Sequence, residues 1–234
     1  MNPARKLVSA LGRWYCRALC RAEHAAQAPG ILNERPAEYG FVFRSLLRCR
    51  PTTVLDVGTG AGSLPHLMSY CGFVVTATDN VRDYWTAGMF NRHFHVVDDD
   101  ITHTKLTGPF DLITCVSVLE HIARPDPAVG AMRGLLKPGG HLVFTFPYNE
   151  RQHVDNAYGL PGATYGRDKP YICQMLSRED LSRWAEQFGL RIVEQEYWRV
   201  WAGEFWAFGE RVVPPRPATT DEPHHLSCVL LEAV

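Results

Sequence analysis

A β-branched run that leads into three closely spaced glycines constrains the fold of this chain more than any other feature. The stretch reads TTVLDVGTGAGSLPHLM, from Thr52 to Met68. A strand, a tight glycine turn and a helix in this order begin a βαβ unit, and the amides of such a turn can approach a bound ligand closely. The pattern therefore predicts a parallel sheet with a ligand site at the carboxyl end of its first strand.

Strand and helix patterns alternate along the rest of the chain, which indicates right-handed crossovers and a mostly parallel sheet. Helices are expected at 62–71, 126–136 and 177–189, the last with a capping box at its start. Strands are expected at 53–57, 72–79, 94–99, 110–117, 139–147, 190–200 and 226–234. The helix signal is weak between residues 80 and 92, so that crossover is expected to be short or irregular.

The first fifty residues are predicted to form helices that cap a core domain spanning 51–234. In MNPARKLVSALGRWYCRALCRAEHAA, apolar residues recur at helical spacing and arginines lie between them. A second helix is predicted over 37–50, ended by Pro51. The first helix is expected to dock on its own domain or in a homodimer, because amphipathicity most often reflects packing. A membrane-surface helix is the alternative, since the polar face is basic.

Composition excludes several classes of protein. The 234 residues carry a formal net charge of −1, which gives no global electrostatic reason to expect nucleic acid as a partner. The seven cysteines form no C-x-x-C pair and are expected to be reduced thiols of a cytoplasmic protein. No apolar run approaches the roughly 20 residues that would span a bilayer.

The glycine spacing argues against a phosphate ligand. Ser63 stands where the dinucleotide fingerprint G-x-G-x-x-G has its third glycine, and no Gly-Lys-Ser/Thr of a P-loop follows. Asp56, two residues before Gly58, would repel a pyrophosphate and suits a ligand with a positive group. A cationic nucleoside without phosphate, such as S-adenosylmethionine, fits these constraints.

The same residues resemble a known family. VLDVGTGAG resembles motif I of the class I S-adenosylmethionine-dependent methyltransferases, and VVTATDN, VVDDDI, CVSVLEHI and LLKPGGHLVFTFP resemble later motifs in the family's order. The resemblance covers residues 52–147. It implies a Rossmann-like α/β fold with a seven-stranded, mostly parallel sheet in the order 3-2-1-4-5-7-6 and helices on both faces. It also implies methyl transfer to a small-molecule acceptor, with S-adenosylhomocysteine as product.

The resemblance assigns the parts of the cofactor to particular residues. Asp79 would accept from the ribose hydroxyls, Asp100 would meet the adenine amino group and the Ile101 backbone the ring edge, with Asp99 as the rival of Asp100. Arg35 and Tyr39, ahead of the first strand, would cover the methionine end. The other residues expected at the cofactor are Asp56, Gly58, Thr59, Gly60, Gly62, Asn80 and Val116.

Methyl transfer is an in-line displacement, so the protein mainly orients the reactants, and a base is needed only for an acceptor that loses a proton. His121, after the fourth strand, is the first candidate base, with orientation of its loop as the alternative role. His153 and Tyr148 are further candidates. The loops 148–176 and 199–224 are expected on the acceptor side, the second being aromatic-rich and equally compatible with core or a dimer face. The role of Glu120 is left open.

No metal is expected, because the histidines at 93–95 and 224–225 lack spaced partners and at most two of the aspartates 98–100 could converge. The Asn/Asp-Pro-Pro-Tyr signature of amino-methyltransferases acting on DNA is absent after the fourth strand. No feature of the sequence separates an oxygen from a nitrogen or carbon acceptor, and a hydroxyl of a sugar, glycan or natural-product precursor is favoured only because O-methylation is frequent in the family. The alternatives are a non-catalytic or regulatory cofactor-binding protein and another transferase on this fold.

Overall fold

The computed structural model describes residues 3–27, 32–82 and 91–234, which belong to two compact units. The unit Met1–Leu32 contains helix α1 (Pro3–Ala25), and the unit Asn33–Val234 contains the other described elements. Helix α2 (Arg35–Cys49) therefore groups with the sheet, whereas the sequence division was drawn at residue 50. Most of the weakly predicted crossover at 80–92 lies outside the described residues.

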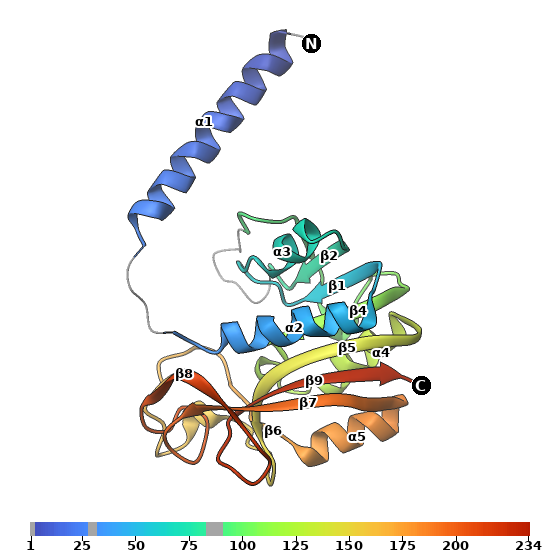
Figure 1. Cartoon of the computed structure of the whole chain (residues 1–234), viewed down its shortest axis with the longest axis vertical. Coiled ribbons are helices and arrows are strands. Elements are labelled where there is room, and N and C mark those ends of the chain that lie inside the picture. Colours follow the sequence, from blue (N-terminus) through green and yellow to red (C-terminus); the bar gives the residue numbers. More distant parts are fainter. Residues whose placement is uncertain (1–2, 28–31, 83–90) are drawn as a thin grey trace. The chain divides into compact units, whose positions relative to one another are not determined.

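One nine-stranded sheet forms the centre of the larger unit (Figure 1). Its order is β3-β2-β1-β4-β5-β9-β7-β8, with the short β6 (Leu176–Ser177) paired to β5. The pairs among β1–β5 are parallel, whereas β9 runs antiparallel to β5 and β7. The other strands are β1 (Thr53–Val57), β2 (Val74–Asp79), β3 (Val96–Asp98), β4 (Phe110–Val116), β5 (Leu136–Asn149), β7 (Leu190–Trp201), β8 (Arg211–Ala218) and β9 (Leu226–Ala233).

The predicted strand order is confirmed for the seven expected strands, with β9 inserted between β5 and β7. Strand β8 is additional and lies in a segment that was predicted as a loop. Its sequence RVVPPRPA contains three prolines, which cannot donate to a ladder and are tolerated at the edge of a sheet. β8 pairs only with β7 in the sheet order, so it occupies such an edge.

Helices pack on both faces of the sheet, as expected. Leu55 of β1 joins one buried cluster with α4 (Asp126–Gly134) and α5 (Arg178–Phe188), and its neighbour Val54 joins the other with α2 and α3 (Leu64–Tyr70). Adjacent side chains of a strand point to opposite faces, which is why one strand supplies both clusters. Three short 3₁₀ turns complete the described elements, at Ile101–His103 (η1), Leu119–His121 (η2) and Ala157–Gly159 (η3).

The predicted capping box at the start of α5 is confirmed. The Ser177 side chain accepts from the amide of Asp180, and the Asp180 carboxylate accepts from the Ser177 amide at 2.8 Å. Gly189 ends the helix at φ 60°, a conformation that favours glycine. These reciprocal bonds satisfy amides that have no partner within the helix.

The cap predicts a measurable contribution to stability. Ser177→Ala should lower the free energy of unfolding by about 1 kcal/mol, because it leaves a helix-terminal amide without its acceptor. Urea titration measures the change. Ser63→Ala is the matched control, since Ser63 caps α3 without a side-chain hydrogen bond and should change stability much less. Equal losses at the two positions would contradict the capping role of Ser177.

Candidate functional site

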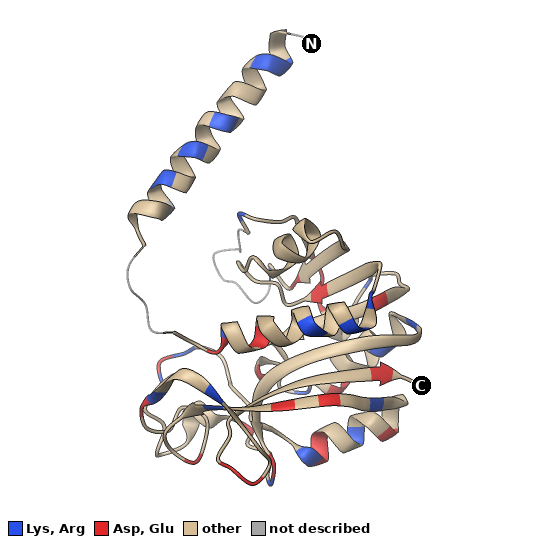
Figure 2. Ribbon diagram, in the orientation of Figure 1, with Lys and Arg blue, Asp and Glu red and all other residues tan. Residues whose placement is uncertain are grey.

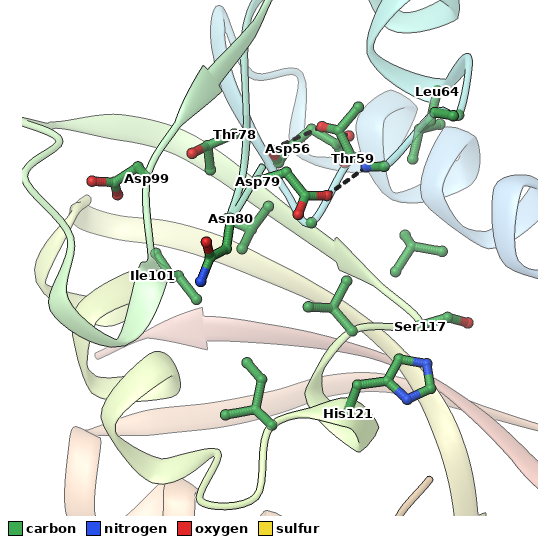
Figure 3. A pocket seen from close by; sticks show the side chains of 18 of the residues that line it. Asp56, Thr59, Leu64, Thr78, Asp79, Asn80, Asp99, Ile101, Ser117 and His121 are labelled. Carbon is green, nitrogen blue, oxygen red and sulfur yellow. Dashed lines mark hydrogen bonds between the residues drawn. The ribbon is translucent and has the colours of Figure 1, made fainter. Parts of the chain in front are cut away.

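A cavity of about 540 Å³ opens at the carboxyl ends of β1, β2 and β4 (Figure 3). Loops that follow adjacent parallel strands meet at this edge, which is where ligands bind in such sheets. Every residue that the sequence assigns to the cofactor lies in its lining, together with His121. These residues are Arg35, Tyr39, Asp56, Gly58, Thr59, Gly60, Gly62, Asp79, Asn80, Asp99, Asp100, Ile101 and Val116.

The glycine loop is shaped by steric necessity and tied to the neighbouring strand. Gly58 has φ +72°, and a Cβ there would lie 2.2 Å from a methyl carbon of Val118, so no side chain fits. The Gly58 amide donates to the Thr78 carbonyl at 2.8 Å, and the Gly60 amide donates to Asp79 Oδ2 at 2.6 Å. Figure 3 shows this last bond, which joins the loop to the end of β2.

Asp56 is a buried carboxyl beneath the loop. It accepts hydrogen bonds from Thr114 Oγ1 at 2.6 Å and from Thr59 Oγ1 at 2.7 Å. Burial nevertheless raises its pKa to about 6, because the two hydroxyls only partly replace lost water. Asp56 therefore shapes the loop through Thr59 and also lines the cavity, so its structural and ligand-facing roles coexist.

Two of the three consecutive aspartates line the cavity, and Asp98 is not among its lining residues. Asp99 Oδ1 accepts from the Lys105 amide at 2.9 Å, so this carboxylate is held by the following loop. Asp100 caps η1 and accepts from the amide and the hydroxyl of Thr102 at 2.9 and 2.7 Å. Burial opposes ionisation of Asp100, but the bonds from Thr102 prevail and lower its pKa. Both aspartates remain candidates for the adenine.

A buried glutamate that the sequence analysis missed positions Arg35. Glu38 is 0% exposed, and its Oε2 accepts from Arg35 Nη1 at 2.8 Å. Its Oε1 accepts from Ser117 Oγ at 2.6 Å and Thr145 Oγ1 at 2.7 Å. These three donors tie α2 to the ends of β4 and β5 and hold the Arg35 guanidinium at the cavity. No local pattern marks Glu38, since its partners Ser117 and Thr145 are 79 and 107 residues away.

The imidazole of His121 is held in one tautomer. Its Nδ1 lies 2.7 Å from the Ile172 carbonyl oxygen, which can only accept, so Nδ1 carries the proton and Nε2 keeps its lone pair. Burial lowers the pKa of His121, which keeps the ring neutral at neutral pH. Tyr171 contacts the ring edge-on at a centroid distance of 4.8 Å and also lines the cavity. A neutral imidazole in this state can accept a proton at Nε2.

Residues 19–195 match the sequence model of a family described as the methyltransferase domain. The chain belongs to this family. The match includes every part of the cavity described above.

Curated proteins similar to this chain are named as O-methyltransferases. The ubiquinone biosynthesis O-methyltransferase of Coxiella burnetii (strain Dugway 5J108-111) is 30% identical over 154 residues, which cover 60% of this chain and 64% of that protein. The protein of the same name from Alkalilimnicola ehrlichii is 26% identical over 202 residues, covering 79% of this chain and 76% of that protein. The chain thus spans just under two thirds of the length of the Coxiella relative.

A solved structure shows the same fold. The N-methyltransferase NodS from Bradyrhizobium japonicum WM9, in complex with S-adenosyl-L-homocysteine, superposes with a TM-score of 0.53 at 18% sequence identity. The alignment covers 86% of this chain and 87% of NodS. The methyltransferase sheet expected from the sequence is therefore present.

Two of the predicted catalytic residues of the methyltransferase domain lie outside the cavity lining. His153 Nδ1 lies 2.9 Å from Asp180 Oδ2, where it supports the start of α5. Tyr148 is fully buried and donates to Glu150 at 2.8 Å. The segment 148–176 reaches the cavity through Tyr171 instead, a residue that no local signal singled out.

The aromatic segment 199–224 contributes no residue to the cavity lining. Trp201 and Trp206 are buried, at 3% and 6% exposure, and their ring centroids lie 6.1 Å apart. The Arg211 guanidinium lies 4.7 Å from the Trp201 ring and pairs with Glu34 at 2.6 Å. This arrangement agrees with the core interpretation of the clustered aromatics.

Neither a metal cluster nor a membrane span occurs in the described part of the chain. Among residues 3–27, 32–82 and 91–234, no group of three or more His, Cys, Asp or Glu residues could hold a metal ion. Within the same ranges, no helix is both long and apolar enough to cross a membrane.

Glu120, the neighbour in sequence of the cavity-lining His121, is a buried carboxyl that has few hydrogen-bond partners. It is 3% exposed, and its Oε1 lies 3.8 Å from His121 Nε2. Its Oε2 has no hydrogen-bond partner in the part of the chain that the structure describes. Its pKa is raised to about 8, chiefly by burial and also by the nearby Glu38, while a backbone hydrogen bond and Arg35 act in the opposite direction. Glu120 is therefore largely protonated at neutral pH.

The raised pKa of Glu120 predicts a pH dependence of stability. The folded state holds this proton more tightly than the unfolded state, so stability falls as pH rises from about 4.5 to about 8. Glu120→Gln should reduce that fall, making the variant relatively more stable at about pH 8.5 than at about pH 5. Urea titrations at both pH values measure the effect. Asp221→Asn, at an exposed carboxylate, should leave the pH dependence unchanged, and the idea fails if both variants behave alike.

Proposed function

We propose that this chain transfers a methyl group from S-adenosylmethionine to a hydroxyl of a small-molecule acceptor. The observation that carries the proposal is the neutral His121, with its Nε2 lone pair available, in the same cavity as the residues expected to hold the cofactor. Membership of the methyltransferase domain family and the O-methyltransferase names of the curated relatives support it.

The chemistry of the cavity lining fits S-adenosylmethionine. Carboxylates at the ends of β2 and β3, Asp79 and Asp100, can accept from a ribose diol and from an adenine amino group. Arg35, fixed by Glu38, offers a guanidinium to a carboxylate. A Cβ on Gly60 would meet nothing within 4 Å, so the loop has open space beside it for a ligand. Asp56 supplies a negative site for the cationic groups.

The chain would contribute orientation and one proton transfer. S-adenosylmethionine supplies a methyl group activated by its sulfonium, so no further activation of that carbon is required. His121 Nε2 would take the proton of the acceptor hydroxyl as its oxygen forms the new bond, and the Ile172 carbonyl would stabilise the imidazolium through Nδ1–H. Tyr171 would orient the acceptor beside His121.

The acceptor is proposed to be a sugar, a glycan or a natural-product precursor with a free hydroxyl. The relatives named for ubiquinone biosynthesis O-methylation support an oxygen acceptor, whereas NodS is named as an N-methyltransferase. A neutral amine needs no base before it attacks, so a dependence on His121 would favour oxygen.

Cofactor binding is the first test of the proposal. Isothermal calorimetry should detect binding of S-adenosylmethionine and S-adenosylhomocysteine but not of NAD. Asp79→Ala should weaken binding by at least about 1.5 kcal/mol, because it removes charge-assisted hydrogen bonds and the acceptor of the Gly60 amide. Asp98→Ala is the matched control, since Asp98 also ends a strand but does not line the cavity. Wild-type affinity in Asp79→Ala would remove Asp79 from the site.

The role of His121 is tested by turnover. With sugars, phenols and amines screened for release of S-adenosylhomocysteine, His121→Gln should retain cofactor affinity and lose about 100-fold or more in turnover on a hydroxyl acceptor. His153→Gln is the control and should retain turnover, because His153 lies outside the cavity lining. Loss in His153→Gln alone would reverse the assignment. Cofactor binding without turnover on any acceptor would favour a regulatory protein.

A further inference from the structure

Helix α1, considered by itself, separates its residues into one apolar and one basic face. At about 100° per residue, its apolar side chains fill an arc of about 140°. The members of this arc are Leu7, Val8, Leu11, Trp14, Tyr15, Ala18, Leu19 and Ala22. Lys6, Arg13, Arg17, Arg21 and His24 fill an arc of about 80° on one flank of it, and Arg5 lies on the other flank. Figure 2 shows the basic residues following one another along the helix.

The basic face carries an unfavourable row of like charges. Arg13, Arg17 and Arg21 are spaced four residues apart, which places neighbouring guanidinium groups next to each other along one face. In this row, Arg13 Nη1 donates to Ser9 Oγ at 2.7 Å, a bond that neutralises no charge. Like charges at this spacing destabilise a helix unless an external negative charge relieves them.

A partner that accommodates both faces at once would stabilise α1 the most. If a protein covered the apolar face, the basic face would stay in water. A helix face exposed to water is more favourable when it carries charges of both signs, but the segment Met1–Leu32 contains a single acid, Glu23. A second copy of α1 would add more positive charge. An anionic bilayer surface accepts apolar side chains below its headgroups and offers phosphates to arginines at the same depth.

We propose that α1 binds the surface of an anionic phospholipid bilayer, lying in the plane of the headgroups. Leu7, Leu11 and Trp14 enter the boundary of the acyl chains, and the arginine row lies among the lipid phosphates. The tryptophan fits this depth, because its ring combines an apolar body with one N–H donor. The inference concerns α1 alone and does not depend on the proposed methyl transfer.

Vesicle sedimentation with the full-length protein tests the proposal. The protein should sediment with vesicles that contain phosphatidylglycerol and remain in solution with pure phosphatidylcholine. Binding should weaken as salt is raised, because the interaction between surface charges is screened. Equal binding to both vesicle types, or no binding to either, would overturn the proposal.

Arg17→Glu separates lipid binding from helix stability. The new carboxylate lies four residues from both Arg13 and Arg21, so it should stabilise the helix while reducing the positive charge by two units. Binding to phosphatidylglycerol vesicles should fall about 30-fold, since each basic residue contributes about 1 kcal/mol at such a surface. Unchanged or tighter binding would contradict a role of the arginine row.

The apolar face is tested by Leu11→Gln, which keeps a residue of high helix propensity but removes an apolar contact and should weaken vesicle binding. Ala10→Gln, on the basic arc, is the matched control and should bind as the wild type does. Light scattering and calorimetry with S-adenosylhomocysteine complete the test. If Leu11→Gln instead abolished a dimer or altered cofactor affinity, α1 would be a protein-docking helix and the proposal would be overturned.

Discussion

The parallel pairing of β1 with both β2 and β4 is the constraint on which the site depends. Its register places Val57 opposite Thr78 and Cys115, so the three strands end at the same level. The glycine loop, Asp79 and Val116 must therefore emerge side by side at one edge. Because strand hydrogen bonds fix this register, the backbone decides at which edge of the sheet the cavity opens.

Buried carboxyl groups connect this edge to the rest of the unit. An ionisable group withdrawn from water is costly unless donors surround it, so Glu38 and Asp56 must order the elements that supply those donors. Glu38 draws together α2, β4 and β5, and Asp56 draws together the glycine loop and β4. Glu120 lacks such a set, and burial therefore raises its pKa. The groups that line the cavity are positioned by polar contacts beneath it.

The antiparallel half of the sheet serves a different purpose. Strand β9 is buried along almost its whole length between β5 and β7, and it extends the core beyond the parallel strands. The proline-rich β8 ends the sheet, where missing amides leave fewer groups for pairing with another chain. Neither strand contributes a residue to the cavity lining, so this half stabilises the unit without contacting the site.

The sequence by itself determined the parts of this protein that depend on short-range patterns. Alternating periodicity indicated the strands, and the family resemblance implied their order. Most residues expected at the cofactor line the cavity because they lie at or near a strand end, whereas Arg35 and Tyr39 reach it from α2. Tertiary structure alone decided which distant side chains meet. Glu38 pairs with Thr145 across 107 residues, and Ile172 fixes the tautomer of His121 across 51. His153 and Tyr148, chosen by residue type and loop position, pack elsewhere. Such contacts depend on how the loops pack in three dimensions, and no local period of the sequence records that packing.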